Sequence, residues 1–491
     1  MYSGRGFEAS ELGDVDVFCH EGMFHLFHLV LPNHDYIAHA VSRDGFLWRR
    51  VKNALFIGEP GDWDDDMLWT MHVSRDPDWP SSFRMFYTGI SRKEDGRIQR
   101  IGLARSNDLY YWEKVSSADY PLTISGPDYE SSVEEGRHWV SCRDPFFYME
   151  GSDRYLLVNA RSASGPVIRR GCVGLARETA PDTFIWERPL FFPRMYDDIE
   201  VPGVIPINGN YYLIGNIKED IKIHYWKADN LLGAYEAFAS NVLLPRGNYA
   251  ARITRDSDRY LLWNFYTDRS KMHRSTILPP PTELQVAEDG QLYLTSYGRF
   301  SEKVQQLIPG EELFPMRKVL ANDTAAAERL QDGISLSSVS GYEIFYFHQQ
   351  ATDFRLSFTL GMSGKGKTGI VFRADEQANG NYISLDVIHG LAQGRVWGYR
   401  EQGGIENAFQ YGTVQGNRFP PLNGKDIRIE IVVFGGYVEL SVDSRIILRY
   451  VETSYMDQSS MGIYVESAVI TLQDIVCETL DGPQEEDHQV L

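Results

Sequence analysis

The sequence predicts an all-β protein, a five-bladed β-propeller followed by a C-terminal β-sandwich, from three observations. Similar strand-like segments recur through the first 300 residues. The chain of 491 residues contains 28 Tyr, 25 Phe and 10 Trp, and aromatic residues favour strands. Apolar and polar residues alternate again from residue 336 onward, between glycine, asparagine and aspartate turns. The length also exceeds the usual size of one domain, so we expect two.

The propeller prediction rests on five apolar segments spaced roughly 50 to 70 residues apart. The segments are FHLFHLV, RMFYTG, RYLLVNAR, NYYLIGN and RYLLWNFY, which begin at residues 24, 84, 154, 210 and 259. The first four precede a second strand-like segment, such as HAVSRDGFLWRRV or LARSNDLYYWEKV, in which D-G or N-D supplies a turn. Repeats of this kind without helical periodicity predict five four-stranded blades over residues 1–300.

The remainder of the chain divides into three parts. Residues 301–335 have mixed charge and the longest helix-compatible segment of the chain, and we expect a linker there. Residues 336–480 contain segments such as FRLSFTL, YISLDVI and RIEIVVFGGYVELSV, which predict an antiparallel β-sandwich. Residues 481–491 are polar and acidic, so we expect a disordered tail.

Composition and motifs disfavour several functions. The formal net charge of −20 opposes binding to nucleic acid or to anionic membrane surfaces, and we expect neither partner. The N-terminal sequence lacks a secretory signal, and no segment stays apolar over the roughly 18 residues that a membrane span needs, so we expect a cytoplasmic protein. The four cysteines lack metal-ligand spacing, and phosphate-binding glycine loops, H-E-x-x-H and G-x-S-x-G motifs are missing. We therefore expect no metal or other cofactor, and chemistry based on carboxylates.

Three acids occupy equivalent positions in the repeats. Asp14 in ELGDVDVF, Asp144 in SCRDPFFYM and Glu200 in YDDIEVPGV each precede the apolar strand of their repeat by about ten residues. The innermost strands of a propeller converge on its axis, so these acids are predicted to meet in one central funnel. Asp16 lies two residues from Asp14, on the same face of an ideal strand. Both carboxylates can therefore enter the funnel, and the pattern does not choose between them as the first catalytic acid.

At these residues the chain resembles the five-bladed propeller enzymes of glycoside hydrolase family 32, the invertases and fructan hydrolases, which share a clan with family 68 and are related to family 43. CRDPFFYMEGSDRYLL is similar to the R-D-P segment of family 32, and EVPGVIPINGNYYLI to its E-C-P acid segment. Further similar segments follow in order between residues 11 and 300, and the sandwich resembles the accessory domain of the family. The first acid segment departs most, because family 32 has W-M-N-D-P-N-G where this chain has ELGDVDVF.

The resemblance implies a glycosidase that cleaves a furanosidic bond, with a β-fructofuranosyl unit preferred. Such cleavage needs one carboxylic acid to protonate the leaving oxygen and one carboxylate to attack carbon or activate water. Glu200, in an apolar segment beside other carboxylates, suits the proton donor, and Asp14 would be the ionised partner. Asp144 is carried over as the acid that holds sugar hydroxyls. Arg143 would orient Asp144 or a substrate oxygen through its rigid donor fork.

Five further residues are substrate-binding candidates besides Asp16 and Arg143. By resemblance, Trp69 and His72 correspond to the substrate wall of the family, and His34 and Asp35 to the segment that borders the sugar subsite. Tyr249 is predicted to reach the funnel from the fifth blade, although a buried structural role suits it equally.

Several alternatives for the function stay open. They are an inverting arabinofuranosidase like those of family 43, a phosphorylase or transferase on the same fold, and a non-catalytic glycan-binding propeller. Families 32 and 43 differ in stereochemistry, since the first retains and the second inverts the anomeric configuration. The sandwich could serve packing, homo-oligomerisation or glycan binding, and the carbohydrate substrate is the one partner that the resemblance implies.

Overall fold

The computed structural model describes residues 1–3, 11–267, 276–402, 405–422 and 424–484. Strands dominate, and in this part of the chain no helix is long and apolar enough to cross a membrane. The chain divides into a first unit, Met1–Leu292, and a second unit, Tyr293–Pro483. The expected acidic tail lies, from residue 485 onward, outside the described residues.

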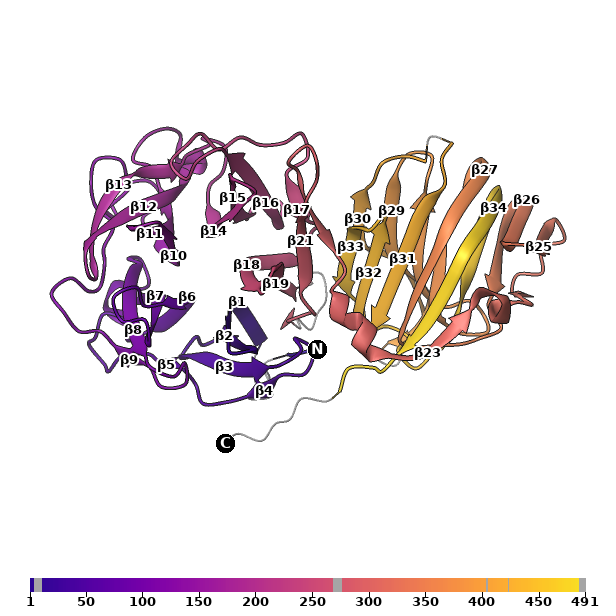
Figure 1. The fold of residues 1–491 in the computed structure, drawn as a ribbon, viewed down its shortest axis with the longest axis horizontal. Helices are drawn as coiled ribbons and strands as arrows, with labels where there is room; N and C mark the ends of the chain where they lie inside the picture. Colours follow the sequence, from indigo (N-terminus) through magenta and orange to yellow (C-terminus); the bar gives the residue numbers. More distant parts are fainter. Residues whose placement is uncertain (4–10, 268–275, 403–404, 423, 485–491) are drawn as a thin grey trace. The chain divides into compact units, whose positions relative to one another are not determined.

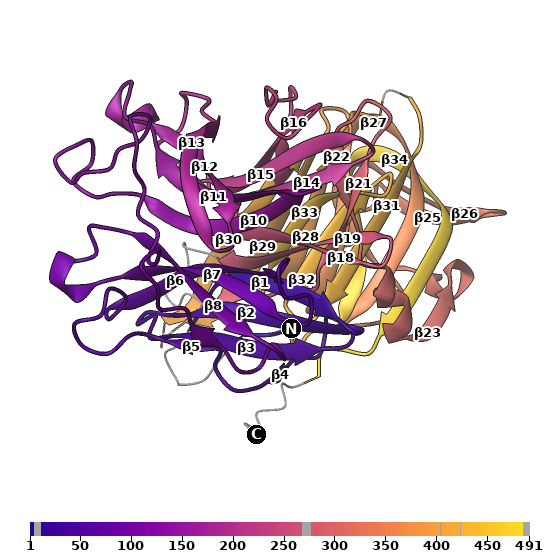
Figure 2. The ribbon, with the colours of Figure 1, turned by 60° about the vertical axis from the view of Figure 1, so that its left-hand side comes forward.

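The first unit is a ring of five antiparallel sheets, which we call blades I to V (Figure 1). Blade I contains β1 (Glu11–His20), β2 (Met23–Leu31), β3 (Tyr36–Ser42), β4 (Arg49–Arg50) and β5 (Leu55–Phe56). Blade II contains β6 (Met67–Arg75), β7 (Phe83–Ile90), β8 (Arg100–Ser106) and β9 (Glu113–Lys114), with η1 (Arg92–Glu94) between β7 and β8. In Figure 2 the strands of blade I lie side by side from β1 to β4.

The other three blades repeat this plan. Blade III contains β10 (Cys142–Glu150), β11 (Asp153–Arg161), β12 (Gly171–Ala180) and β13 (Thr183–Phe191), with η2 (Val167–Arg169) before β12. Blade IV contains β14 (Ile199–Ile207), β15 (Asn210–Ile217), β16 (Lys222–Ala228) and β17 (Val242–Leu244). Blade V contains β18 (Asn248–Asp256), β19 (Arg259–Thr267), β20 (Thr276–Ile277), β21 (Thr282–Val286) and β22 (Leu292–Thr295).

The five apolar segments of the sequence form β2, β7, β11, β15 and β19, the second strand of each blade, and the prediction of five blades is confirmed. These strands are continuously apolar because neighbouring blades cover both of their faces. On β11, for example, Leu156 packs with residues of blade II and Leu157 with residues of blade IV. The hairpin before β15 turns at Asn208 and Gly209, which both have positive φ, as a two-residue type I′ turn requires.

The ring closes between its last and its first blade. The innermost strands β1, β6, β10, β14 and β18 lie next to one another in this order, and β18 also lies next to β1 (Figure 1). The Oγ1 of Thr254 on β18 donates a hydrogen bond to the carbonyl oxygen of Val17 on β1. Tyr2 pairs with Leu278 through an isolated antiparallel bridge. Side chains from distant sequence positions therefore share one central axis.

The second unit is a β-sandwich whose strands pair into one continuous twelve-stranded sheet. Its strands are β23 (Val304–Pro309), β24 (Arg317–Lys318), β25 (Ala325–Leu330), β26 (Gly333–Tyr346), β27 (Phe354–Ala374), β28 (Gly380–Asp386), β29 (Leu391–Gln402), β30 (Ile405–Arg418), β31 (Ile427–Phe434), β32 (Tyr437–Val442), β33 (Arg445–Val451) and β34 (Ser460–Leu480), and its short helices are η3 (Gly298–Lys303) and η4 (Gly310–Leu313). The long strand β27 pairs with β31 through its first half and with β28 through its second half. Its register against β34 breaks between Gly364 and Lys367, and such irregularities let a strand pass from one layer to the other.

The structure differs from the expectation of a linker at 301–335, because strands form there. Instead of a helical connector, this segment contains β23, which pairs with β34, and β24 and β25, which both pair with β26. The helix-forming run AAAERL of β25 becomes a strand because β26 offers it a complete set of backbone partners. Tertiary pairing overrides the local helix preference here.

Candidate active site

All five innermost strands share one irregularity. The register between the first and second strand of each blade shifts at a β-bulge, which falls between Leu12 and Val15, Trp69 and Met71, Arg143 and Phe146, Glu200 and Gly203, and Tyr249 and Arg252. Three bulges hold a non-glycine residue at positive φ, namely Asp144 (58°), Val201 (48°) and Ala250 (55°). Bulges redirect side chains and are frequent next to active sites. The bulge falls at or beside Asp14, Thr70, Asp144, Glu200 and Tyr249 on the five innermost strands.

The structure brings together the three predicted acids Asp14, Asp144 and Glu200, each at the bulge of its blade. Burial and the charge of Asp144 raise the pKa of Asp14 to about 7, and the charge of Glu200 adds to this shift. Burial also raises the pKa of Glu200, against the lowering effect of Arg143. Because like charges in one buried site cannot all ionise freely, the protons in this cluster belong to the group as a whole.

Asp144 is held rigidly from two neighbouring blades. Its backbone N–H donates to Oγ1 of Thr88 at 3.1 Å, and its Oδ2 accepts a hydrogen bond from the N–H of Val201 at 3.0 Å. The Nε of Arg143 lies 3.6 Å from the same oxygen. The side chain of Asp144 is only 4% exposed, so its position is fixed before any ligand arrives.

Glu200 is more accessible, with 18% of its side chain exposed. Its Oε1 accepts a hydrogen bond from Nη2 of Arg143 at 2.9 Å, and its Oε2 accepts one from the hydroxyl of Tyr249. The predicted residues Arg143 and Tyr249 therefore both contact this acid, from blades III and V. A carboxyl group that is partly open and raised in pKa has the properties of a proton donor.

The two candidates for the first acid differ in their surroundings. Asp14 accepts a hydrogen bond from Oγ1 of Thr70, which lowers its pKa but does not offset burial. The sequence analysis predicts an ionised Asp14. Its pKa of about 7 means instead that this carboxyl titrates near neutral pH. Asp16 accepts a hydrogen bond from the N–H of Val73 at 2.7 Å and lies 3.4 Å from Nδ1 of His72. These contacts occupy Asp16, which is 3% exposed.

Arg252 of β18 is a buried cation next to the acids. Its guanidinium donates to the carbonyl oxygens of Pro202 at 2.7 Å and Pro145 at 2.9 Å, which both lie within bulges. Its Nε lies 3.8 Å from Oδ1 of Asp16, and its charge lowers the pKa of Asp14. One side chain from blade V thus links the inner strands of blades I, III and IV.

The remaining predicted residues lie on blades I and II. The rings of His34 and Trp69 are 6.2 Å apart, and both His34 Nδ1 and Trp69 Nε1 are buried without a hydrogen-bond partner. Trp69 directly precedes Thr70, whose hydroxyl donates a hydrogen bond to Asp14. The ring of His72 packs against Phe146 at 4.4 Å. Asp35 is half-buried, and its backbone carbonyl accepts a hydrogen bond from Ile57.

Sequence reasoning missed three residues of this site: Thr70, Arg252 and Asp198, whose Oδ2 lies 3.4 Å from Nη2 of Arg143. Arg252 carried a signal, since a charged residue follows two alanines in an otherwise apolar strand, YAARI. Asp198 precedes Glu200 by two residues, a spacing that places both on one face of a strand. Thr70 had no signal, because its contact with Asp14 depends on the bulge of β6. Within the described ranges, no cluster of His, Cys, Asp and Glu side chains could hold a metal ion.

Solved structures share this fold at low sequence identity. Fructan 1-exohydrolase IIa from Cichorium intybus has a TM-score of 0.69 at 13% identity, covering 96% of each chain. Exo-inulinase from Aspergillus awamori has a TM-score of 0.70 at 12% identity, again over 96% of each chain. The GH32 β-fructofuranosidase of Bombyx mori has a TM-score of 0.63 at 13% identity, covering 96% of this chain and 92% of that chain. No protein-family model matches the sequence, and no curated protein does.

Proposed function

We propose that this protein is a glycoside hydrolase that cleaves a furanosidic bond, with a β-fructofuranosyl unit as its preferred substrate. The observation that carries the proposal is the meeting of Asp14, Asp144 and Glu200, from three different blades, in one electrostatically coupled cluster. A structural role for three mutually repelling, buried carboxyl groups has no evident benefit, because each raises the cost of ionising its neighbours.

In this proposal Glu200 is the general acid and base, and Asp14 is the nucleophile. The carboxylate of Asp14 attacks the anomeric carbon while the bond to the leaving oxygen breaks, and the proton of Glu200 passes to that oxygen. Glu200 then takes a proton from water, which attacks the same carbon and releases Asp14. Thr70 and Arg252 both favour the ionised form of Asp14 that the first step requires.

Two further contacts support these roles. Arg143 and Tyr249 hold the two oxygens of Glu200, so the proton that it donates has a defined direction. Asp144 is ordered by blade II and by the N–H of Val201, directly after Glu200, which suits a fixed acceptor for sugar hydroxyls. Asp16 has a supporting role here, because its oxygens already contact Val73, His72 and Arg252.

The substrate class rests on the fold neighbours and on the sequence resemblance. The neighbours carry names of enzymes that act on fructans, inulin or fructofuranosides, and two were solved in complex with 1-kestose and with sucrose. A fructosyl preference is the simplest reading of both likenesses. An arabinofuranoside with inversion is the alternative, since the first acid segment lacks the W-M-N-D-P-N-G pattern.

The test is a hydrolysis screen with sucrose, inulin, levan and aryl arabinofuranosides, using wild type, Glu200→Gln and Asp14→Asn. We expect release of fructose by wild type and a loss of kcat of about 10³-fold or more in each variant, since each removes a group that acts on the reacting atoms. Exposed carboxyls provide matched controls: Glu236→Gln and Asp229→Asn should keep wild-type turnover.

The other outcomes separate the alternatives. Sugar binding by calorimetry without turnover of any glycoside, in wild type as in Glu200→Gln, would point to a glycan-binding propeller instead. Turnover of the arabinofuranoside alone, with the inverted anomer seen first by NMR, would assign the inverting chemistry. Products that depend on added phosphate or on a sugar acceptor would indicate a phosphorylase or transferase.

A further inference from the structure

Two carboxylates share the Nη2 atom of Arg143. Its Nη2 donates to Oε1 of Glu200 at 2.9 Å and lies 3.4 Å from Oδ2 of Asp198. Burial alone would lower the pKa of Arg143, but Asp198, Asp144 and Glu200 raise it, so the group stays charged. Glu200 is therefore not the sole partner of this cation, and Asp198 competes for it.

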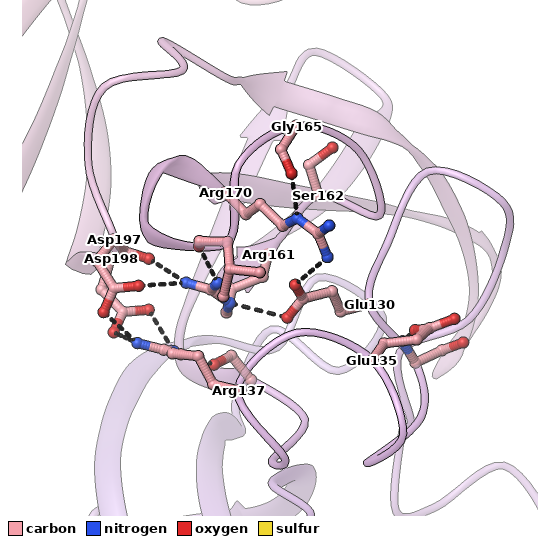
Figure 3. A network of polar contacts seen from close by, with 12 residues as sticks. Glu130, Glu135, Arg137, Arg161, Ser162, Gly165, Arg170, Asp197 and Asp198 are labelled. Carbon is pink, nitrogen blue, oxygen red and sulfur yellow. Dashed lines mark hydrogen bonds and ion pairs between the residues drawn. The ribbon is translucent and has the colours of Figure 1, made fainter.

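Asp198 is in turn held by a second arginine. Arg137, in the loop before β10, contacts both of its oxygens, with Nη1 at 2.7 Å from Oδ2 and Nη2 at 3.1 Å from Oδ1 (Figure 3). The Asp198 side chain is 2% exposed. Burial alone would raise its pKa, but Arg143, Arg137 and Arg161 lower it, so Asp198 carries its charge at neutral pH.

The loop that supplies Arg137 is anchored by further ion pairs in the same network (Figure 3). Arg161 donates to Oε2 of Glu130 at 2.8 Å and to Oδ1 of Asp197 at 2.7 Å, and Arg170 donates to Oε1 of Glu130 at 2.7 Å. Glu130 and Arg161 are fully buried. Because bidentate and charge-assisted contacts of this kind fix geometry, the position of Arg137 is set by blade III itself.

We propose that Asp198 is a positioning residue for Glu200: shared between Arg137 and Arg143, it competes with Glu200 for Arg143 and so keeps that carboxyl able to hold its proton. The proposal rests on the proposed function, in which Glu200 is the general acid. Asp198 acts on Glu200 through Arg143, and its own charge raises the pKa of Glu200 as well.

The electrostatics around Glu200 agree with this role. Arg143 lowers the pKa of Glu200, whereas burial and the charges of Asp144 and Asp198 raise it. The titratable and charged groups that face Glu200 are Arg143 and Asp144 of blade III, Asp198 of blade IV, Tyr249 of blade V and Asp14 of blade I. Among these, Asp198 is the carboxylate with an ion pair to a loop arginine outside the acid cluster.

Two substitutions test the proposal because it predicts opposite shifts for them. Asp198→Asn removes the competing charge, so Arg143 acts fully on Glu200 and the pKa of Glu200 should fall by on the order of half a unit or more. Arg137→Gln leaves Asp198 to Arg143 alone, which draws Arg143 further from Glu200, and the pKa of Glu200 should rise. Asp197→Asn is the matched control, since Asp197 belongs to the same network but contacts Arg137 and Arg161, not Arg143.

The pKa of Glu200 is read directly by ¹³C NMR of carboxyl-labelled glutamate in the full chain, with the resonance assigned by its loss in Glu200→Gln. In parallel, the alkaline limb of kcat against pH should move down in Asp198→Asn and up in Arg137→Gln, with KM changed less than twofold. Unchanged or same-direction shifts in the two variants, or an equal shift in Asp197→Asn, would overturn the proposal. The NMR titration requires no turnover, so an inactive wild type would refute the proposed function and leave this inference testable.

Discussion

Arg252 gives the sharpest test of how the blades are held around the funnel. Its buried guanidinium donates to the carbonyl oxygens of Pro202 and Pro145 at 2.7 and 2.9 Å, lies 3.8 Å from Asp16, and covers the ring of Phe146 at 5.5 Å. Burial lowers the pKa of Arg252, while the charges of Asp16, Asp144 and Asp14 oppose that effect. The substitution Arg252→Met keeps most of the side-chain volume and removes the charge and both hydrogen bonds.

The expected cost follows from these contacts. Removing one partner of a buried charge pair typically costs about 3 to 5 kcal/mol, because the other charge stays buried without compensation. Each buried carbonyl oxygen left without a donor adds about 1 to 3 kcal/mol, although such terms overlap and do not sum fully. We therefore expect Arg252→Met to lower the free energy of unfolding of the first unit by about 4 kcal/mol or more. Arg252→Lys should lower the free energy of unfolding by an intermediate amount, since one ammonium group cannot replace the two hydrogen bonds of the planar guanidinium.

The assay is urea unfolding followed by tryptophan fluorescence, with Arg255→Met as the control. Arg255 lies three residues further along β18 and is exposed, so its replacement should change stability by less than about 0.5 kcal/mol. A double-mutant cycle with Asp16→Asn should give a coupling energy of about 1 kcal/mol or more, because the two charges are paired. A destabilisation by Arg252→Met that matches the Arg255 control, or a coupling of zero, would refute the reasoning.

Two predictions concern pH. Thr70→Val removes the hydrogen bond that lowers the pKa of Asp14, so the pKa should rise above about 7 and the acid limb of kcat/KM should move to higher pH, whereas the exposed Thr179→Val should leave the profile unchanged. His25 is hydrogen-bonded to His39, and burial lowers its pKa to about 4. The unfolded chain binds this proton below about pH 6.5, so stability is full above that pH and falls as the pH drops toward 4, by about 3 kcal/mol for this group. In thermal unfolding, the stability of His25→Gln should fall correspondingly less than that of wild type over this pH range. An equal fall in the two proteins would contradict the low pKa of His25.

The fold was predictable because its strongest sequence signal has a direct physical cause. The second strand of each blade is buried on both faces, so segments such as RYLLVNAR and RYLLWNFY are continuously apolar and stand out as repeats. The strands at 304–309 and 325–330 had no comparable signal. The first is mostly exposed, and the second, AAAERL, consists of good helix formers that pair only because β26 lies beside them.

The sequence pointed to the three acids of the proposed site and to Arg143 and Tyr249, which contact Glu200. Asp14, Asp144 and Glu200 occupy equivalent positions in the repeats, and a single sequence is enough to show this. The choice between Asp14 and Asp16 was not predictable from the sequence. The two-residue period applies to a regular strand, and a bulge between Leu12 and Val15 interrupts this strand. Thr70 and Arg252 contact their partners from other blades, so their roles depend on the ring and not on the local sequence.

The acids of blade I lie close to a cation from the last blade. Asp14 and Asp16 lie on the first innermost strand and Arg252 on the last, so the cation that offsets their charge comes from the blade made furthest along the chain. Burial raises the pKa of Asp14, and the charge of Arg252 limits the rise. The proton affinity of Asp14 thus depends on Asp144, Glu200 and Arg252 of other blades, so it is a property of the assembled ring.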